Sequence, residues 1–217
     1  MLSDLKSLLP IVTPVVTAVV AIVAVMLTRK QIKLSNKQHL FDKRIENYII
    51  ATGLIQLYTS NCKCINNEKD KPMLSTKFDF ALLTNNTYLE QITCAIYNPL
   101  KEPSQKELLI KLENLKEVAT KIKFLFSDNV SILLGDFVLC YQELLSEMYK
   151  YQITLNGINK ENENGNHKLT FKEIAPKVGE EKHRVKLQEA FDNLKQADSA
   201  LKKANVEERI KKQIKLY

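Results

Sequence analysis

Residues Leu8–Leu27 read LLPIVTPVVTAVVAIVAVML, twenty consecutive residues without a charge. At about 1.5 Å rise per residue, a helix of this length spans roughly the 30 Å hydrocarbon core of a bilayer. The core helix of a small water-soluble domain is seldom apolar on every face over such a length. The sequence therefore predicts a transmembrane anchor within residues 1–28.

The main alternative interpretation of this segment is a cleaved signal peptide. The apolar region of a signal peptide is usually shorter, about 7–15 residues, and is followed by a small-residue cleavage site. Pro10 falls in the predicted first turn, where a missing N–H is harmless. Pro14 predicts a kink, and the hydroxyls of Thr13 and Thr17 are available to the freed backbone groups. Because the apolar run is long and basic residues follow it directly, we expect a retained single-pass anchor.

The flank that follows is strongly basic. Between positions 29 and 44 there is one acid, Asp42, and there are six bases, namely Arg29, Lys30, Lys33, Lys37, Lys43 and Arg44. This local excess supplies most of the formal net charge of +7, so a nucleic-acid-binding face spread over the rest of the chain is not expected. Basic flanks are retained in the cytoplasm, which predicts a short external N-terminus and a cytosolic C-terminal part. The six bases are the predicted membrane-surface residues, each contributing on the order of 1 kcal/mol at an anionic leaflet.

The remaining chain has the composition of a helical protein. Of 217 residues, 45% are hydrophobic and 26% are charged, which excludes a wholly disordered chain. Five glycines and six prolines are too few for a turn-rich sandwich or barrel. The next most apolar stretch, Phe124–Leu145, contains three acids, so we expect no second span. The sequence predicts an all-α protein, in which the anchor continues into a cytosolic antiparallel bundle of four or five helices.

Apolar periodicity places the individual helices. The first is predicted to run over 28–58, and its inner face comprises Phe41, Ile45, Tyr48, Thr52 and Ile55. A polar loop over 60–76 and a second helix over 77–97 follow, and Asn98-Pro99 ends that helix. A capping box formed by Ser104 and Glu107 begins a third helix. Its predicted buried stripe is Leu108, Leu112, Leu115, Ala119, Ile122 and Phe126. Ser127-Asp128 then starts a fourth helix, which reaches Tyr151.

The last third of the chain is more polar. A mobile loop is predicted from Asn156 to Lys168, and Thr170 and Glu173 form a second capping box for a short helix that Pro176 limits. The predicted divisions are therefore the anchor (1–28), the bundle (29–155), a mobile loop with a short helix (156–178) and one long charged helix (179–217). Because the apolar stripe of the last helix is thin, we expect it to pack on one neighbour or to extend as a coiled coil. Its candidate partner contacts are Leu187, Phe191, Leu194, Leu201, Ile210 and Ile214.

No set of side chains predicts catalysis, a cofactor or a metal site. The cysteines are expected to be reduced, with Cys94 and Cys140 as small buried hydrophobes. Cys62 and Cys64 offer two thiolates, but a structural zinc site needs four ligands and no second pair follows. Glu180 and His183 form a single Glu-x-x-His motif, whereas di-iron bundles use two with further glutamates. We therefore expect a protein that is not an enzyme.

The stretch from His39 to Tyr48, HLFDKRIENY, carries a more specific pattern. It resembles the L-F-D-K-R-x-x-x-Y pattern found just after the anchor in small uncharacterised bacterial single-pass membrane proteins. The resemblance implies a bacterial membrane protein, and such proteins often occur in mobile or phage-related gene neighbourhoods. Phe41 and Tyr48 also lie one heptad apart, so the first packed turn of a helical bundle explains the same pattern.

Two functions from different classes follow from these features. The first is a membrane-anchored interaction module, a scaffold, adaptor or sensor, at the cytosolic face of a bacterial inner membrane. Its partners would be membrane lipids and an unidentified protein or a second copy of the chain. The alternative is an effector of phage defence that oligomerises and disrupts the membrane. In that case Thr13, Pro14 and Thr17 would lie in a helix–helix interface.

Overall fold

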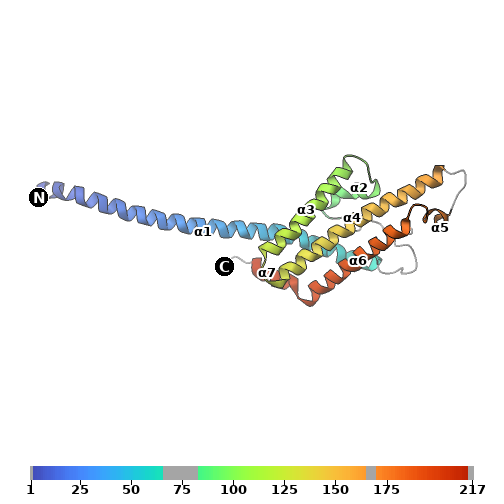
Figure 1. Cartoon of the computed structure of the whole chain (residues 1–217). Helices are drawn as coiled ribbons and strands as arrows, with labels where there is room; N and C mark the ends of the chain where they lie inside the picture. Colours follow the sequence, from blue (N-terminus) through green and yellow to red (C-terminus); the bar gives the residue numbers. More distant parts are fainter. Residues whose placement is uncertain (1, 66–82, 165–169, 215–217) are drawn as a thin grey trace. The chain divides into compact units, whose positions relative to one another are not determined.

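The computed structural model describes residues 2–65, 83–164 and 170–214, and these are helical without a β-strand. The elements are α1 (Leu2–Ile65), the 3₁₀ helix η2 (Glu90–Ile92), α2 (Thr93–Tyr97), α3 (Ser104–Leu125), α4 (Asp128–Asn164), α5 (Phe171–Ile174), α6 (Glu180–Lys203) and α7 (Val206–Ile214) (Figure 1). The predicted all-α class and the long apolar N-terminal helix are confirmed.

The chain divides into two compact units, Met1–Lys43 and Arg44–Tyr217, and α1 contributes to both. The boundary lies beyond the predicted end of the anchor at residue 28, because residues 29–40 are all exposed and join no core. The first six residues of the predicted loop over 60–76 belong to α1, and the other positions of that loop lie outside the described residues.

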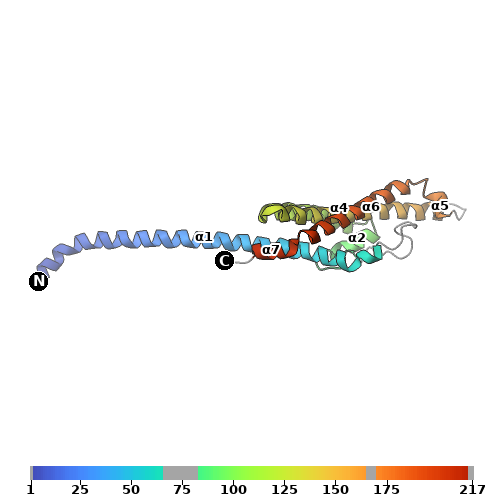
Figure 2. The same cartoon turned by 90° about the horizontal axis from the view of Figure 1, so that it is seen from below.

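Within the second unit, α4 packs along α3 on one side and along α6 on another. Figure 1 shows α3 and α6 running opposite to α4, and Figure 2 shows α4 and α6 side by side from a second direction. All six predicted stripe residues of α3 and its C-cap are buried in the common core: Leu108, Leu112, Leu115, Ala119, Ile122 and Phe126. Tyr141 of α4 lies at the centre of this core and donates a hydrogen bond to the carbonyl of Leu83 at 2.8 Å.

The part of α1 in the second unit buries a different face from the predicted one. The predicted residues Phe41, Ile45, Tyr48, Thr52 and Ile55 are only half-buried. The buried positions are instead Asn47, Ala51, Leu54 and Tyr58, one residue earlier along most of the stripe. A stripe assigned from large apolar side chains misses this face, because its members include a small residue and a polar one.

The predicted helix over 77–97 is wrong. Positions 77–82 lie outside the described residues, and the chain from Leu83 forms turns before the short η2 and α2. The side-chain oxygen of Asn86 accepts hydrogen bonds from the N–H groups of Tyr88 (3.1 Å) and Leu89 (2.8 Å). An asparagine that binds the next backbone N–H groups offers the chain a turn in place of a helix. The predicted end before Pro99 is confirmed by α2, which ends at Tyr97.

The two predicted capping boxes have different outcomes. Helix α3 begins at Ser104 as predicted, but no side chain caps it. Instead, the N–H of Gln105 in the first turn donates to the carbonyl of Lys101 at 3.0 Å, so the preceding turn takes the role of the cap. At α5, the carboxylate of Glu173 accepts hydrogen bonds from the Thr170 N–H (2.7 Å) and hydroxyl (2.8 Å). These bonds lower the pKa of Glu173, and α5 ends at Ile174 before Pro176.

The predicted loop over 156–168 is wrong for its first nine positions, which continue α4 to Asn164. Ile158 is buried against Ile174 and Ala175 of the α5 segment, in a cluster separate from the main core. A single well-placed apolar residue gives this polar stretch a surface to bury, and the helix continues across it.

The predicted single helix over 179–217 is also wrong, since its described part is divided into α6 and α7. Asn205, between them, has φ 47°, a left-handed conformation typical of the residue that ends a helix. The Ala204 N–H still bonds the Ala200 carbonyl at 3.1 Å, so α6 is closed normally before the chain turns. The break changes the direction of the chain and lets α7 pack on α4.

Candidate membrane segment and interaction surface

The apolar part of α1 is exposed throughout its described side chains, residues 14–27. Among them are nine large apolar residues, each between 49% and 66% exposed: Val15, Val16, Val19, Val20, Ile22, Val23, Val25, Met26 and Leu27. In the described part of the chain, α1 is the one helix long and apolar enough to cross a membrane. Such a continuous apolar surface is not stable in water and identifies this segment as the candidate site for lipid contact.

The backbone of this segment suits a hydrocarbon environment. A helix satisfies its N–H and C=O groups internally, which a membrane-spanning segment requires. At its C-terminal end, the hydroxyl of Thr28 donates to the carbonyl of Ala24 at 2.8 Å, so this polar side chain is also satisfied within the helix. The first exposed charges, Arg29 and Lys30, follow directly.

Five of the six predicted membrane-surface residues are exposed on α1: Arg29, Lys30, Lys33, Lys37 and Lys43. At about 100° per residue, these five positions fall within an arc of about 140°, so the charge forms one broad face of α1. Long basic side chains at the end of an apolar helix can reach lipid phosphates from any side of it. Their placement is compatible with the predicted contact with headgroups.

Arg44, the sixth predicted residue, is not a surface group. Its Nε donates to the carbonyl of Leu125 at 2.7 Å, and its Nη1 donates to the carbonyl of Gln213 at 2.9 Å. The guanidinium also lies 5.9 Å from the ring centre of Phe126. Arg44 therefore binds the carbonyl ends of α3 and α7, and we remove it from the membrane-surface set. Sequence alone could not distinguish it from its basic neighbours, because both carbonyl partners are more than 80 positions away.

The predicted partner contacts of α6 and α7 are also corrected. Five of them are at most 5% exposed and belong to the protein's own core: Leu187, Phe191, Leu194, Leu201 and Ile210. Ile214 is half-buried against the same core. Helix α4 packs against both α6 and α7 and covers their thin apolar stripe, so this stripe is not available to another protein.

The other chemically distinctive residues have structural roles. Glu180 is buried and accepts a hydrogen bond from the hydroxyl of Tyr151, while Arg184 pairs with it at 3.3 Å. Burial, together with this bond to Glu180, raises the pKa of Tyr151. Among the described residues, no three histidine, cysteine or acidic side chains are grouped as metal ligands. The contacts of Glu180 are those of a buried hydrogen-bond acceptor.

The cysteines with described side chains, Cys62, Cys94 and Cys140, form no disulfide. Cys94 is exposed, which corrects its prediction as a buried hydrophobe. Cys140 is half-buried, and burial raises the pKa of its thiol above the usual value. A thiol with a raised pKa is protonated at neutral pH and weakly reactive, which fits a packing role for Cys140.

Some residues of interest carried no sequence signal. Asp198 and Lys202 resemble an ordinary i,i+4 pair on a charged helix, yet they lie beside a cavity that forms only because α6 and α7 turn toward α1.

Comparison with protein-family models, with curated proteins and with solved structures finds no match to this chain.

Proposed function

We propose that this protein is a single-pass protein of a bacterial inner membrane whose helical domain is a cytosolic interaction module. It would act as a scaffold, adaptor or sensor and not as an enzyme. The observation that carries the proposal is the fully exposed apolar surface of residues 14–27 on a helix that continues into a folded core at Ala51, Leu54 and Tyr58. One end of α1 needs lipid and its other end is an integral part of a packed domain.

The orientation follows from charge. The basic residues after Leu27 would stay on the cytoplasmic side, and the unit that begins at Arg44 would then lie in the cytosol as an antiparallel helical bundle. With the α6 stripe buried, the proposed partner surface moves to exposed apolar residues elsewhere on that unit. Phe124 is the most prominent of them, at 85% exposed.

Topology reporters test the anchor and its orientation. Alkaline phosphatase fused after Tyr217 should be inactive and green fluorescent protein should be fluorescent, because the first folds only outside the cytoplasm and the second only inside. Replacing Arg29, Lys30, Lys33 and Lys37 with glutamate should weaken the preference for a cytosolic C-terminus. Active phosphatase on the unmodified chain would contradict the cytosolic assignment.

The interaction role is tested separately with the full chain in native membranes. Cross-linking through a photoreactive group in place of Phe124 should capture a defined protein or a second copy, and Phe124→Ser in the otherwise unmodified chain should reduce co-purification of the same species. A matched photoreactive group at Lys116, exposed on the same helix, should give no such adduct. Purified chain in dye-loaded liposomes should leave them intact, whereas leakage would favour the membrane-disrupting alternative.

A further inference from the structure

A cavity of about 510 Å³ lies between α1, α4, α6 and α7, entirely within the Arg44–Tyr217 unit. This volume falls within the range of small-molecule sites in proteins. Its wall is mainly apolar, with Ile55 of α1, Leu201 of α6 and Ile210 of α7 among its members. A concave apolar site with a few polar groups is the usual form of a ligand pocket.

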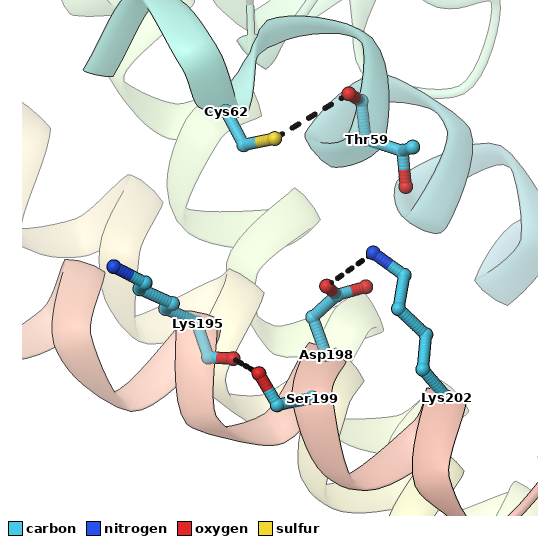
Figure 3. A network of polar contacts seen from close by, with 6 residues as sticks. All are labelled: Thr59, Cys62, Lys195, Asp198, Ser199 and Lys202. Carbon is cyan, nitrogen blue, oxygen red and sulfur yellow. Dashed lines mark hydrogen bonds and ion pairs between the residues drawn. The ribbon is translucent and has the colours of Figure 1, made fainter. Parts of the chain in front are cut away.

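The most informative polar group at this cavity is the carboxylate of Asp198. Its side chain is 9% exposed, and one oxygen, Oδ2, accepts an ion-paired hydrogen bond from Lys202 Nζ at 2.6 Å. The other oxygen, Oδ1, is buried and has no hydrogen-bond partner within the described part of the chain. Figure 3 shows the Asp198–Lys202 pair on the side of α6 that faces Thr59 of α1. A buried carboxylate oxygen without a donor is unfavourable, and a ligand with an N–H group would satisfy it.

A second unsatisfied group lines the same cavity from the other side. The hydroxyl of Tyr48 on α1 is buried and has no partner among the described residues. A phenol hydroxyl both donates and accepts, so it can bind an N–H group or a hydroxyl. Two residues that each carry an unsatisfied polar atom, on different helices, therefore line one apolar cavity.

The one buried charge among the residues that line the cavity is negative. Three acids, Asp198, Glu207 and Glu208, line it against one base, Lys202. Glu207 and Glu208 are exposed and pair with Lys211 at 3.0 and 3.5 Å, so solvent screens them. The buried Asp198 carboxylate is the charge that a ligand would experience most strongly.

We propose that this cavity binds a small organic ammonium ion. Its N–H group would donate to Asp198 Oδ1, and its apolar body would lie against Ile55, Leu201 and Ile210. The site goes beyond the proposed function, because ligand binding needs only the helical unit and is measurable whichever way the chain lies in a membrane. Because α1 and α6 both contribute, an occupied cavity would link these two helices directly.

Methyl NMR of the full chain in lipid nanodiscs tests whether the cavity binds an ammonium ion, with isoleucine methyl groups as reporters. Phenethylamine, protonated at neutral pH, is the probe, and 2-phenylethanol and phenylacetate are its neutral and anionic counterparts. We expect saturable shifts at Ile55 and Ile210 and none at Ile174, which lies in a separate cluster. Phenethylamine should bind about tenfold more tightly than 2-phenylethanol, and phenylacetate should not bind.

Two variants distinguish a specific site from nonspecific uptake. Asp198→Asn keeps the side-chain shape and should weaken phenethylamine about tenfold while leaving 2-phenylethanol unchanged. Thr59→Trp changes an exposed lining residue, so the fold is retained while the added ring blocks the cavity to both compounds. The proposal is overturned if no cavity methyl shifts up to about 10 mM probe, or if the cation and the anion bind equally. Unchanged phenethylamine affinity in a folded Asp198→Asn protein would overturn it as well.

Discussion

Arg44 shows how one side chain can connect segments that are distant in sequence. It begins the second unit and donates to carbonyls at the ends of α3 and α7. The last carbonyls of a helix have no partner within the helix, and a guanidinium can bind two of them in different directions. The charge of Arg44 is therefore used inside the helical unit.

Removing this group should destabilise the helical unit. Arg44→Met should lower the free energy of unfolding by about 1.5–3 kcal/mol, the usual range for hydrogen bonds from a charged donor. Arg44→Lys should recover little, because an ammonium cannot reproduce the fork of the guanidinium. Lys37→Ala, on an exposed position of the same helix, is the control and should change stability by less than about 0.5 kcal/mol. Urea unfolding in detergent measures the free energy of unfolding of the three variants. Equal stability of the Arg44→Met variant and the wild-type chain would contradict a stabilising role of Arg44.

Tyr58 predicts a loss of stability in alkaline solution. Burial, aided by electrostatic interaction with Cys62 and Asp198, raises its pKa from 10.0 to about 12. Between these two values the unfolded chain releases the phenol proton while the folded chain keeps it, so stability is intact below pH 10 and falls as the pH rises. Burial also raises the pKa of Tyr141, which adds to the effect.

The measurement is urea unfolding from about pH 7 to about pH 12. Tyr58→Phe should differ from the wild type by a constant amount below pH 10 and should lose stability less steeply above it. Parallel curves over the whole range would show that Tyr58 does not titrate differently in the two states.

Two glycines of α4 show how the same residue type differs along one element. A Cβ on Gly135 would lie 2.9 Å from the carbonyl oxygen of Ala119 and 2.7 Å from side-chain atoms of Lys123, both on α3. Gly135 therefore sets how closely these two helices approach. A Cβ on Gly157 would meet nothing within 4 Å, so this glycine only weakens the helix.

Alanine should consequently have opposite effects at these two positions. Gly135→Ala should destabilise the helical unit by about 1–3 kcal/mol, because α3 has to move away from α4. Gly157→Ala should stabilise it by about 0.5–1 kcal/mol through helix propensity. Thermal unfolding by circular dichroism compares them, and stabilisation by Gly135→Ala would show that α3 and α4 are free to separate.

At the scale of the whole molecule, α1 carries the proposed membrane insertion. Nine exposed apolar residues, at about 0.3–0.6 kcal/mol each on the insertion scale, favour the membrane by roughly 3–5 kcal/mol. Each arginine placed centrally in a span costs roughly 2.5–3.5 kcal/mol. Two arginines are therefore enough to reverse the balance.

The double variant Val16→Arg/Val23→Arg should move the chain from the carbonate-washed membrane fraction to the supernatant or to degradation. Ile32→Arg/Leu34→Arg is the matched control, since both residues are exposed apolar positions of α1 beyond the predicted span. The control should stay in the membrane fraction. Equal membrane retention of both double variants would refute insertion through residues 8–27.

The sequence by itself determined the helical class, the apolar segment, the buried face of α3 and the helix ends before Pro99 and Pro176. These features are local, because a hydrophobic period or a missing N–H acts within one or two turns.

Only the tertiary structure decided what covers each apolar face. It paired Arg44 with Leu125, extended α4 through contact of Ile158 with Ile174, and buried the stripe of α6 under α4. It also formed the cavity at Asp198, since a cavity depends on how several helices meet. A periodic pattern predicts that one face of a helix will be buried. The helix that covers this face lies far away in sequence, and it is selected by its shape and by unsatisfied polar groups.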